Sequence, residues 1–298
     1  MENKSCVVIC AARNIEQTFY KDLKRISESL SRFDEVSWIV IESDSDDNSS
    51  QLLSRVAIQS SNFQFVSLGP LSQRIPIRTE RLAFVRNTGL QMLRDSENLE
   101  NIDFVIVADL NGTNSAISKL GVDSCFTHLD WDACFANPLG PYYDVWALRH
   151  PVWSPNDCWE YLNFLRQHHR SPGKSLFAAV HSRMIKINPD SPWIPVLSAF
   201  GGFAIYRTTS ILSAEYRGLT SDGKEICEHV PLNLELSEKG KRLFINPQMV
   251  NCQYNDHNIN LAWSRRFIRW SKYPLKFVKG YVGSKNDKRI SGARGLFG

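Results

Sequence analysis

Asp103-Phe-Val-Ile-Val-Ala-Asp109-Leu-Asn111-Gly112 is a short apolar run that ends in an acid, an amide and a glycine. The five apolar residues, β-branched in the middle, are typical of a strand that is buried on both faces. In parallel α/β sheets, ligands bind beyond the carboxyl ends of the strands. We therefore expect Asp109 and Asn111 either to share a hard cation beside a phosphate-bearing ligand or only to cap a turn.

Apolar runs and helical periodicity alternate on the N-terminal side of this strand. The runs predict strands at 5–12, 36–41 and 63–68. Residues 16–33 have apolar side chains at spacings of three or four, residues 80–93 predict a helix with its leucines and Val85 inward, and another helix begins near Leu52. Strands that alternate with helices predict an α/β fold with a mostly parallel sheet flanked by helices.

The pattern becomes weaker after Gly112, where Trp, Pro, His and Asn are frequent. We expect no internal repeat and no linker before about residue 262. The elements that we expect here are strands at 126–135 and 143–148, a helix at 157–169, a glycine-led strand at 200–206, a helix at 230–239 and a strand at 242–245 closed by Asn246-Pro247.

The composition of the 298 residues is that of an ordinary globular protein, with 43% hydrophobic and 22% charged residues. No run approaches the roughly 20 apolar residues that span a bilayer. The first residues lead directly into a strand and contain no signal-peptide pattern, so we expect a cytoplasmic protein. The seven cysteines form no Cys-x-x-Cys pair, which argues against a zinc site and for reduced thiols.

The last residues, 262–298, form a basic segment with ten Lys or Arg residues and one acid, Asp287. Since the whole chain has a net charge of +4, this extension carries +9 and the preceding residues carry about −5. Among these charges lie Trp263, Phe267, Trp270, Tyr273, Phe277 and Tyr281. Such a segment favours peripheral contact with an anionic membrane surface over nucleic acid. A helix packed on the domain, with a solvated basic face, is the alternative.

Polar side chains follow three of the predicted parallel strands. Arg13 and Asn14 end the first, the loop from Glu42 to Asp44 ends the second, and Asp109 ends the central strand. Because these ends meet at one edge of a sheet, carboxylates and amides there can bind a base, a ribose and a diphosphate. The chain has neither a Gly-x-Gly-x-x-Gly nor a P-loop motif, which disfavours a classical dinucleotide fold and a P-loop protein.

Four segments resemble, in chain order, motifs of family 2-type glycosyltransferases. They are Glu42-Ser-Asp44-Ser-Asp46-Asp47-Asn-Ser, Arg81-Leu-Ala83-Phe-Val-Arg86-Asn87-Thr-Gly89, Phe200-Gly201-Gly202-Phe-Ala-Ile-Tyr206, and Cys227-Glu228-His229 with the later strand that reaches Pro247. The residues of these motifs are most similar to those of the fungal capsule-associated mannosyltransferase group. The resemblance covers residues 5–258 and implies a GT-A fold, Rossmann-like and nucleotide-sugar-binding, over residues 1–261. It also implies a nucleotide-sugar donor and a divalent cation, Mn²⁺ or Mg²⁺.

The resemblance also implies roles for individual residues. Glu228 is the candidate catalytic base, and Trp193, Gly201 and Gly202 are candidates for the acceptor side. The candidate metal ligands and donor-binding residues are Asp109, Asn111 and His257 for the metal, and Ala12, Arg13, Glu42, Asp44, Arg81, Arg86, Asn87 and Asp109 for the donor.

The chain departs from the family pattern at three positions. Ser43 stands where the second acid of the family's loop usually contacts the base. Asn111 stands where the family has a second Asp, and a neutral oxygen attracts a hard cation less than a carboxylate does. His229 replaces the Asp of the family's Glu-Asp pair, so that Glu228 is the carboxylate left there. Glu228 could instead cap a helix or pair with an arginine or lysine. Arg86 could bind phosphate or form a salt bridge with Asp109.

Each remaining candidate has a structural alternative. Asn87 could be a helix-interior amide bonded to a loop, and Arg81 a solvated helix residue. Trp193 could stack on a sugar or anchor the core. The two glycines could allow close approach of a ligand or form a β-bulge, and His257 could be a surface histidine.

The function that we expect is metal-assisted sugar transfer, with mannose suggested by the resemblance, to a glycan or lipid-linked acceptor in polysaccharide biosynthesis. The transfer would take place in the cytoplasm or at the cytosolic face of a membrane. Two alternatives stay open, a sugar nucleotidyltransferase and a catalytically silent carbohydrate-binding module on the same fold.

Overall fold

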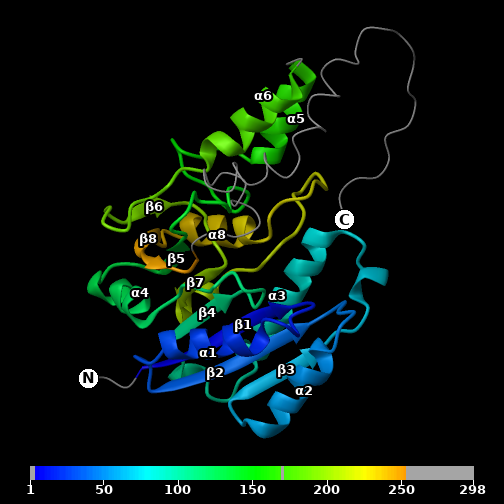
Figure 1. Ribbon diagram of the computed structural model, residues 1–298, viewed down its shortest axis with the longest axis vertical. Helices are drawn as coiled ribbons and strands as arrows, with labels where there is room; N and C mark the ends of the chain where they lie inside the picture. Colours follow the sequence, from blue (N-terminus) through cyan, green and yellow to red (C-terminus); the bar gives the residue numbers. More distant parts are fainter. Residues whose placement is uncertain (1–3, 169–170, 253–298) are drawn as a thin grey trace, which may run out of the picture. The chain divides into compact units, whose positions relative to one another are not determined.

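One sheet of eight strands runs through the residues that the structure describes, 4–168 and 171–252 (Figure 1). The structure is a computed structural model. The strands lie in the order β3-β2-β1-β4-β7-β5-β8-β6. They are β1 (Ser5–Ala12), β2 (Glu35–Glu42), β3 (Phe63–Ser67), β4 (Phe104–Ala108), β5 (Ala133–Asn137), β6 (Ile194–Val196), β7 (Phe203–Arg207) and β8 (Leu243–Val250).

The first four strands form a parallel half. β1 pairs in parallel with both β2 and β4, and β2 pairs in parallel with β3. All five residues of β4 are buried, as expected for a central strand covered on both faces. The register places Ala12 beside Glu42, so β1 and β2 end together. The predicted α/β fold class is confirmed, and the parallel pairing expected from the sequence holds for this half.

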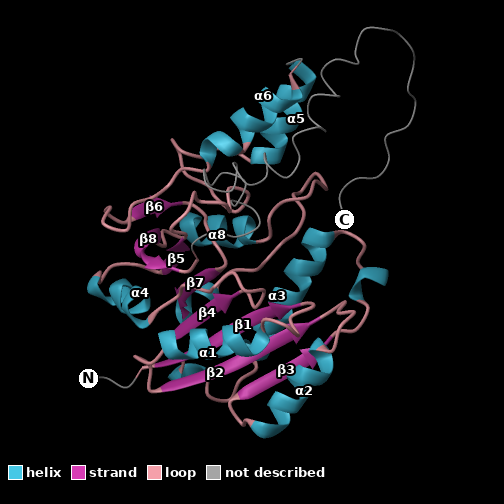
Figure 2. Ribbon diagram, in the orientation of Figure 1, coloured by secondary structure: helices cyan, strands magenta, loops and turns pink. Residues whose placement is uncertain are grey.

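Helices cover both faces of the sheet (Figure 2). Apolar residues of α3 and α8 pack with one set of strand side chains, and those of α1, α2 and α4 pack with the other set. The helices are α1 (Phe19–Ser29), α2 (Ser49–Gln59), α3 (Arg78–Arg94), α4 (Lys119–Ser124), α5 (Cys158–His168), α6 (Pro172–Ala179), α7 (Thr208–Ile211) and α8 (His229–Glu238), with short 3₁₀ turns η1 (Leu71–Gln73), η2 (Leu99–Asn101), η3 (Cys125–Thr127) and η4 (His181–Arg183).

The other four strands form a mixed half. β7 runs antiparallel to both β4 and β5, β8 runs parallel to β5, and β6 runs antiparallel to β8. The register between β5 and β8 shifts between Phe135 and Asn137. Pro247 lies in β8 at this irregularity, where a missing N–H does least harm to the ladder. The strand predicted to close at Asn246-Pro247 therefore continues to Val250.

Two strand predictions in the mixed half are wrong. Residues 143–148 form an irregular buried segment, and the strand expected at 126–135 begins only at Ala133. The side chain of Arg149 donates to the carbonyls of Trp146 and Leu148 at 2.9 and 2.8 Å. These bonds satisfy two carbonyls that would otherwise need hydrogen bonds from a neighbouring strand. The apolar segment can therefore be buried without pairing as a strand.

The helical pair α5 and α6 is separate from the two faces of the sheet. The two helices lie side by side in both ribbon views and share a small apolar cluster that includes Cys158, Leu162 and Ala179 (Figures 1 and 2). The sequence predicted α5 but not α6. In the described part of the chain, no helix is both long enough and apolar enough to cross a bilayer. His257 and the basic segment 262–298 lie outside the described residues.

Candidate functional site

The loops that follow β1 and β2 are tied together by their own polar groups. Arg13 Nε donates to the carbonyl of Asp44 at 3.0 Å, and Arg81 Nε of α3 lies 3.7 Å from Asp44 Oδ2. Asn14 and Asp44 have positive φ angles of 52° and 58°, a conformation that Asn and Asp tolerate better than most residues. Three predicted donor-binding residues, Arg13, Asp44 and Arg81, therefore meet at this edge.

Electrostatics keep Asp44 ionised. Burial alone would raise the pKa of its carboxyl group, but hydrogen bonds from Ser72 and the charges of Arg81 and Arg13 outweigh it and lower the pKa. Glu42, at the end of β2, is buried and accepts hydrogen bonds from Ser45 N and from the Ser67 hydroxyl. Its carboxylate therefore shapes the loop from within.

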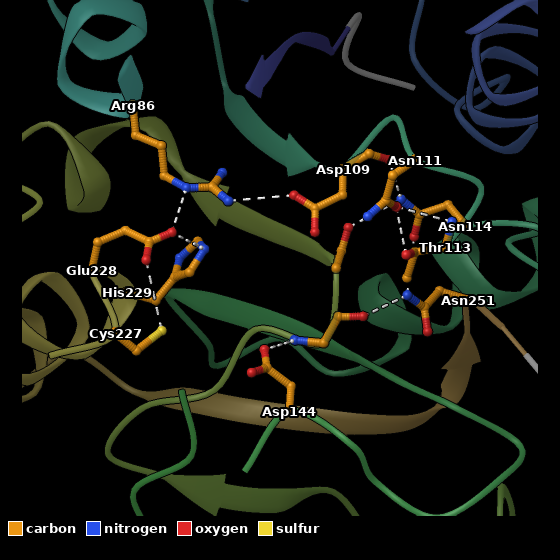
Figure 3. Close-up of polar contacts among 12 residues, drawn as sticks. Arg86, Asp109, Asn111, Thr113, Asn114, Asp144, Cys227, Glu228, His229 and Asn251 are labelled. Carbon is orange, nitrogen blue, oxygen red and sulfur yellow. Dashed lines mark hydrogen bonds and ion pairs between the residues drawn. The ribbon is translucent and has the colours of Figure 1, made fainter. Parts of the chain in front are cut away.

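Asp109, Arg86 and Glu228 form a buried chain of charges beside this loop pair (Figure 3). Arg86 Nη2 donates to Asp109 Oδ1 at 3.3 Å, and Arg86 Nε donates to Glu228 Oε1 at 2.9 Å. The Arg86 and Glu228 side chains are 7% and 6% exposed, whereas that of Asp109 is 29% exposed. Arg86, on α3, thus connects the end of β4 with the start of α8, and Asp109 is the part of the chain of charges that solvent reaches.

Burial and pairing act in opposite directions on these groups. Burial raises the pKa of Asp109, and the neighbouring Arg86 only partly opposes this. Burial would lower the pKa of Arg86, but the charges of Glu228 and Asp109 raise it, so the guanidinium is permanently charged. Arg86 Nη1 is buried and has no hydrogen-bond partner among the described residues.

His229 is a neutral neighbour of this chain. Its ring stacks on Phe200 with centroids 3.8 Å apart and meets Tyr216 edge-on. Burial, followed by the charge of Arg86, lowers the pKa of His229 well below its usual value. The residue that replaces the family's second acid therefore packs as an uncharged aromatic ring.

Gly201 and Gly202 form the turn that leads into β7 and touches the end of β4. Their φ angles are 72° and 89°. Asp109 N donates to the carbonyl of Gly202 at 3.0 Å. A Cβ on Gly202 would lie 2.7 Å from Thr113 Cγ2. The glycines are therefore required by a left-handed turn and by close approach of protein atoms.

Three polar residues that the sequence analysis did not single out surround this turn. Asp144 Oδ2 accepts a hydrogen bond from Gly201 N at 2.9 Å. Asn251 Nδ2 donates to the Gly201 carbonyl at 2.6 Å, and Asn114 Nδ2 donates to the Gly202 carbonyl at 3.0 Å. The signal that could have identified Asp144 is its position as an acid inside the apolar segment 142–148, since carboxylates are seldom buried without a purpose.

The side-chain amide oxygen of Asn111 is occupied by hydrogen bonds within its own turn and does not face a cation site formed by the described residues. Its Oδ1 accepts hydrogen bonds from Thr113 N at 3.2 Å and from the Thr113 hydroxyl at 2.5 Å. This is the turn that the sequence analysis kept as an alternative. Among the described residues, no group of three or more His, Cys, Asp or Glu side chains could hold a metal ion. These residues do not form a complete protein cage for a cation, but a partly exposed carboxylate fits a cation that a substrate phosphate also holds.

Two other candidates have structural contacts. The side-chain amide of Asn87 donates to the Tyr216 carbonyl and accepts from Tyr216 N, both at 2.9 Å, so it ties α3 to a loop. Trp193 meets the rings of His128 and Phe244 edge-on, with centroids 4.7 and 5.7 Å apart. This packing favours its interpretation as a core anchor, on the outer strands of the mixed half.

This edge of the sheet therefore offers two kinds of ligand-binding group. The loops after β1 and β2 offer charged and hydrogen-bonding groups that suit a polar ligand, and Asp109 offers a carboxylate beside a fixed cationic group. The glycine turn connects Asp109 to Asp144. A ligand that reaches across β4 would contact both halves of the sheet.

Comparisons with known proteins identify solved structures of low sequence identity. TarS residues 1–349 of S. aureus in complex with UDP-GlcNAc is 14% identical, with 87% of this chain and 61% of that chain covered at a TM-score of 0.46. The mannosyltransferase PcManGT of Pyrobaculum calidifontis in complex with GDP-Man and Mn²⁺ is 14% identical, with 92% and 63% covered at 0.47. Glucosyl-3-phosphoglycerate synthase of Mycobacterium tuberculosis in complex with UDP is 15% identical, with 89% and 78% covered at 0.38.

The chain spans about three fifths of the length of the first two of these structures. No protein-family model matches the chain, and no curated protein matches it.

Proposed function

We propose that this chain is a GT-A-type glycosyltransferase that moves a sugar from a nucleotide donor to a hydroxyl acceptor. The observation that carries the proposal is the contact of Asp109 with Arg86 at the carboxyl end of β4, next to the linked loops that follow β1 and β2. Carboxyl ends of parallel strands are where α/β proteins bind nucleotides. The ordered motifs that resemble family 2-type glycosyltransferases supply these residues.

The donor would lie along the parallel half. The loop that holds Arg13 and Asp44 would receive the base and ribose, with Ala12 and Glu42 shaping its floor and Arg81 fixing Asp44. The diphosphate would lie near Asp109 and Arg86. A guanidinium with a fixed charge can offset the negative charge that grows on the leaving diphosphate.

Glu228 has a different role in this proposal from the base expected from the sequence. Its carboxylate is 6% exposed and 2.9 Å from Arg86 Nε. A carboxylate that is buried and already bound to a guanidinium is not placed to meet an acceptor hydroxyl. We infer that Glu228 positions Arg86, which is the ion-pair alternative from the sequence analysis.

A divalent cation, Mn²⁺ or Mg²⁺, remains part of the proposal. If Asp109 and Glu228 are both ionised, their charges and that of Arg86 sum to −1, which would repel a diphosphate. A cation held jointly by Asp109 and the donor phosphates would reverse this local charge and act as a Lewis acid for the leaving group. Asn111 could join only by leaving Thr113, and His257 lies outside the described residues.

The acceptor would approach from the Gly201–Gly202 turn, on the other side of Asp109. Mannose as the transferred sugar, and kinship with the fungal capsule-associated group, rest on the sequence resemblance alone. Peripheral membrane contact through the extension 262–298 rests on its charges and aromatic residues. A lipid-linked acceptor would fit such a location.

Release of nucleoside diphosphate from nucleotide sugars tests the proposal. With GDP-mannose, UDP-glucose and UDP-GlcNAc as donors and water as the acceptor, the wild type should release diphosphate slowly and more rapidly with Mn²⁺. Asp109→Asn should abolish the release. Asp130→Asn removes an exposed carboxylate near Arg242 and should leave the rate unchanged.

Other outcomes would favour the alternative functions. Binding of saccharides that is indifferent to nucleotide and cation would favour a silent carbohydrate-binding module. Release of pyrophosphate from a nucleoside triphosphate and a sugar phosphate would favour a sugar nucleotidyltransferase.

A further inference from the structure

Asp144 lies on the acceptor side of the glycine turn. It belongs to the irregular segment between β5 and α5 and is partly buried. Its Oδ2 accepts a hydrogen bond from Gly201 N at 2.9 Å, while the next residue, Gly202, accepts one from Asp109 N at 3.0 Å. Two adjacent backbone units thus connect Asp144 with Asp109, and Figure 3 shows both side chains beside this turn.

Asp144 and Glu228 differ in what holds their charge. Glu228 is in an ion pair with Arg86 and is almost fully buried. Asp144 forms no ion pair with any described residue, and its partners are the neutral backbone amides of Gly201 and Ala147. A general base must be free to accept a proton and must lie within reach of the substrate. Of these two carboxylates, Asp144 is the one without an ion pair to a described residue and the one that is only partly buried.

The surroundings of Asp144 suit a group that exchanges protons near neutral pH. The pKa of Asp144 is raised to about 6: burial is the largest cause, and the charges of Asp109 and Glu228 add to it. Its carboxylate accepts hydrogen bonds from the backbone amides of Gly201 and Ala147, which oppose this rise. The other titratable groups whose charges couple to it are Tyr142, Tyr143 and Cys227, and burial raises the pKa of each, so they are neutral at pH 7. General bases are most effective when their pKa lies near the working pH.

We propose that Asp144 is the base that takes the proton from the acceptor hydroxyl; this assignment rests on the proposed function. In this step the acceptor oxygen forms a bond to the anomeric carbon of the donor sugar. The bond from that carbon to the diphosphate oxygen breaks, and its electron pair leaves with the nucleoside diphosphate. The hydroxyl proton passes to the Asp144 carboxylate. Direct displacement of this kind inverts the anomeric carbon.

Two substitutions separate the proposed role from a structural one. In Asp144→Asn, the amide oxygen can still accept the Gly201 N–H bond, but the side chain cannot take a proton. In Asp144→Ala, both the bond and the base are lost. If Asp144 only holds the turn, the loss of activity should follow the loss of stability and be much larger in Asp144→Ala. If Asp144 is the base, both variants should lose activity to a similar extent.

The experiment measures nucleoside diphosphate release from the donor that the wild type turns over best, with water as the acceptor. Asp144→Asn should reduce kcat by about 100-fold or more, bind the donor as the wild type does, and be at least as stable at pH 7. The acid limb of the wild-type pH profile, near pH 6, should disappear from the residual activity of the variant. Asp130→Asn is again the matched carboxylate-to-amide control.

Two results would overturn the assignment while leaving the proposed function intact. They are an Asp144→Asn variant with kcat within about threefold of the wild type, or one that keeps the same acid limb. A wild type that binds no donor and releases no diphosphate would overturn both. Loss of turnover in Glu228→Gln, with full activity in Asp144→Asn, would return the role of base to Glu228.

Discussion

The two halves of the sheet hold their polar groups in different ways. In the parallel half, β3-β2-β1-β4, strands end side by side and their loops are linked by charged side chains such as Arg13, Asp44 and Arg81. In the mixed half, the groups near β7 are glycine backbone atoms bound by the amides of Asn114 and Asn251. The difference suggests a charged side for a nucleotide and a mostly neutral side for an acceptor, with Asp144 as the carboxylate beside the turn.

Replacing Arg86 should have the largest effect, because Arg86 connects the two halves. Arg86→Met would leave the buried carboxylate of Glu228 and the partly exposed carboxylate of Asp109 without their ion-pair partner. We expect a loss of about 3–5 kcal/mol in the free energy of unfolding, as for other broken buried ion pairs. Urea unfolding at pH 7 measures it.

Arg55→Met, at an exposed position of α2, is the control for this experiment. It should change the free energy of unfolding by no more than about 0.5 kcal/mol. An Arg86→Met variant as stable as Arg55→Met would contradict the view that Arg86 stabilises the fold as the counter-charge of Asp109 and Glu228.

Replacing Gly202 should have the next largest effect and tests the turn of the mixed half. Gly202→Ala would place a Cβ 2.7 Å from Thr113 Cγ2 on a backbone with φ of 89°. Strain and overpacking together should cost about 2–3 kcal/mol. Gly240→Ala is the matched control, because Gly240 has φ of 76° and nothing within 4 Å of the added Cβ, so only the strain of about 1 kcal/mol applies. Equal losses would mean that the turn is less tightly packed than we describe.

Asp144 should give the smallest effect on stability, and one that depends on pH. Its pKa is raised from 3.8 to about 6 on folding, so between these pH values the folded state binds the proton and the unfolded state does not. The stability of the wild type should therefore fall as the pH rises through this range. The amide side chain introduced by Asp144→Asn carries no proton that is lost in this range. Relative to the wild type, the free energy of unfolding of Asp144→Asn should therefore rise by about 1–3 kcal/mol as the pH goes from 4 to 7.

Thermal or urea unfolding of both proteins at several pH values measures this difference. A stability difference that is constant from pH 4 to pH 7 would show that Asp144 does not hold its proton more tightly in the folded protein.

The same division explains how much of the fold could be predicted from the sequence. The central strands of the parallel half, β1 and β4, are apolar runs buried on both faces, and the sequence predicts both with nearly correct bounds. In the mixed half, buried carbonyls are satisfied by side chains such as Arg149, which leaves no periodic pattern. The apolar segment 143–148 was therefore taken for a strand.

For the candidate site too, residues in local sequence patterns could be predicted and long-range contacts could not. The sequence offers the pairing of Arg86 with Asp109 as one of two alternatives, because Arg86 lies in a predicted helix and Asp109 directly follows a predicted strand. Asp144 was missed because its partner, Gly201, lies 57 residues away. No local pattern marks a contact across that distance.

Titration calorimetry of nucleotide binding tests the central claim most directly. The full-length wild type would be titrated with GDP, UDP, GDP-mannose and UDP-glucose, with and without Mn²⁺, beside Asp109→Asn and Asp144→Asn. We predict that at least one nucleotide binds the wild type, that Mn²⁺ strengthens the binding, that Asp109→Asn weakens it and that Asp144→Asn does not. Failure of all four nucleotides to bind at millimolar concentration, with Mn²⁺ present, would contradict the account.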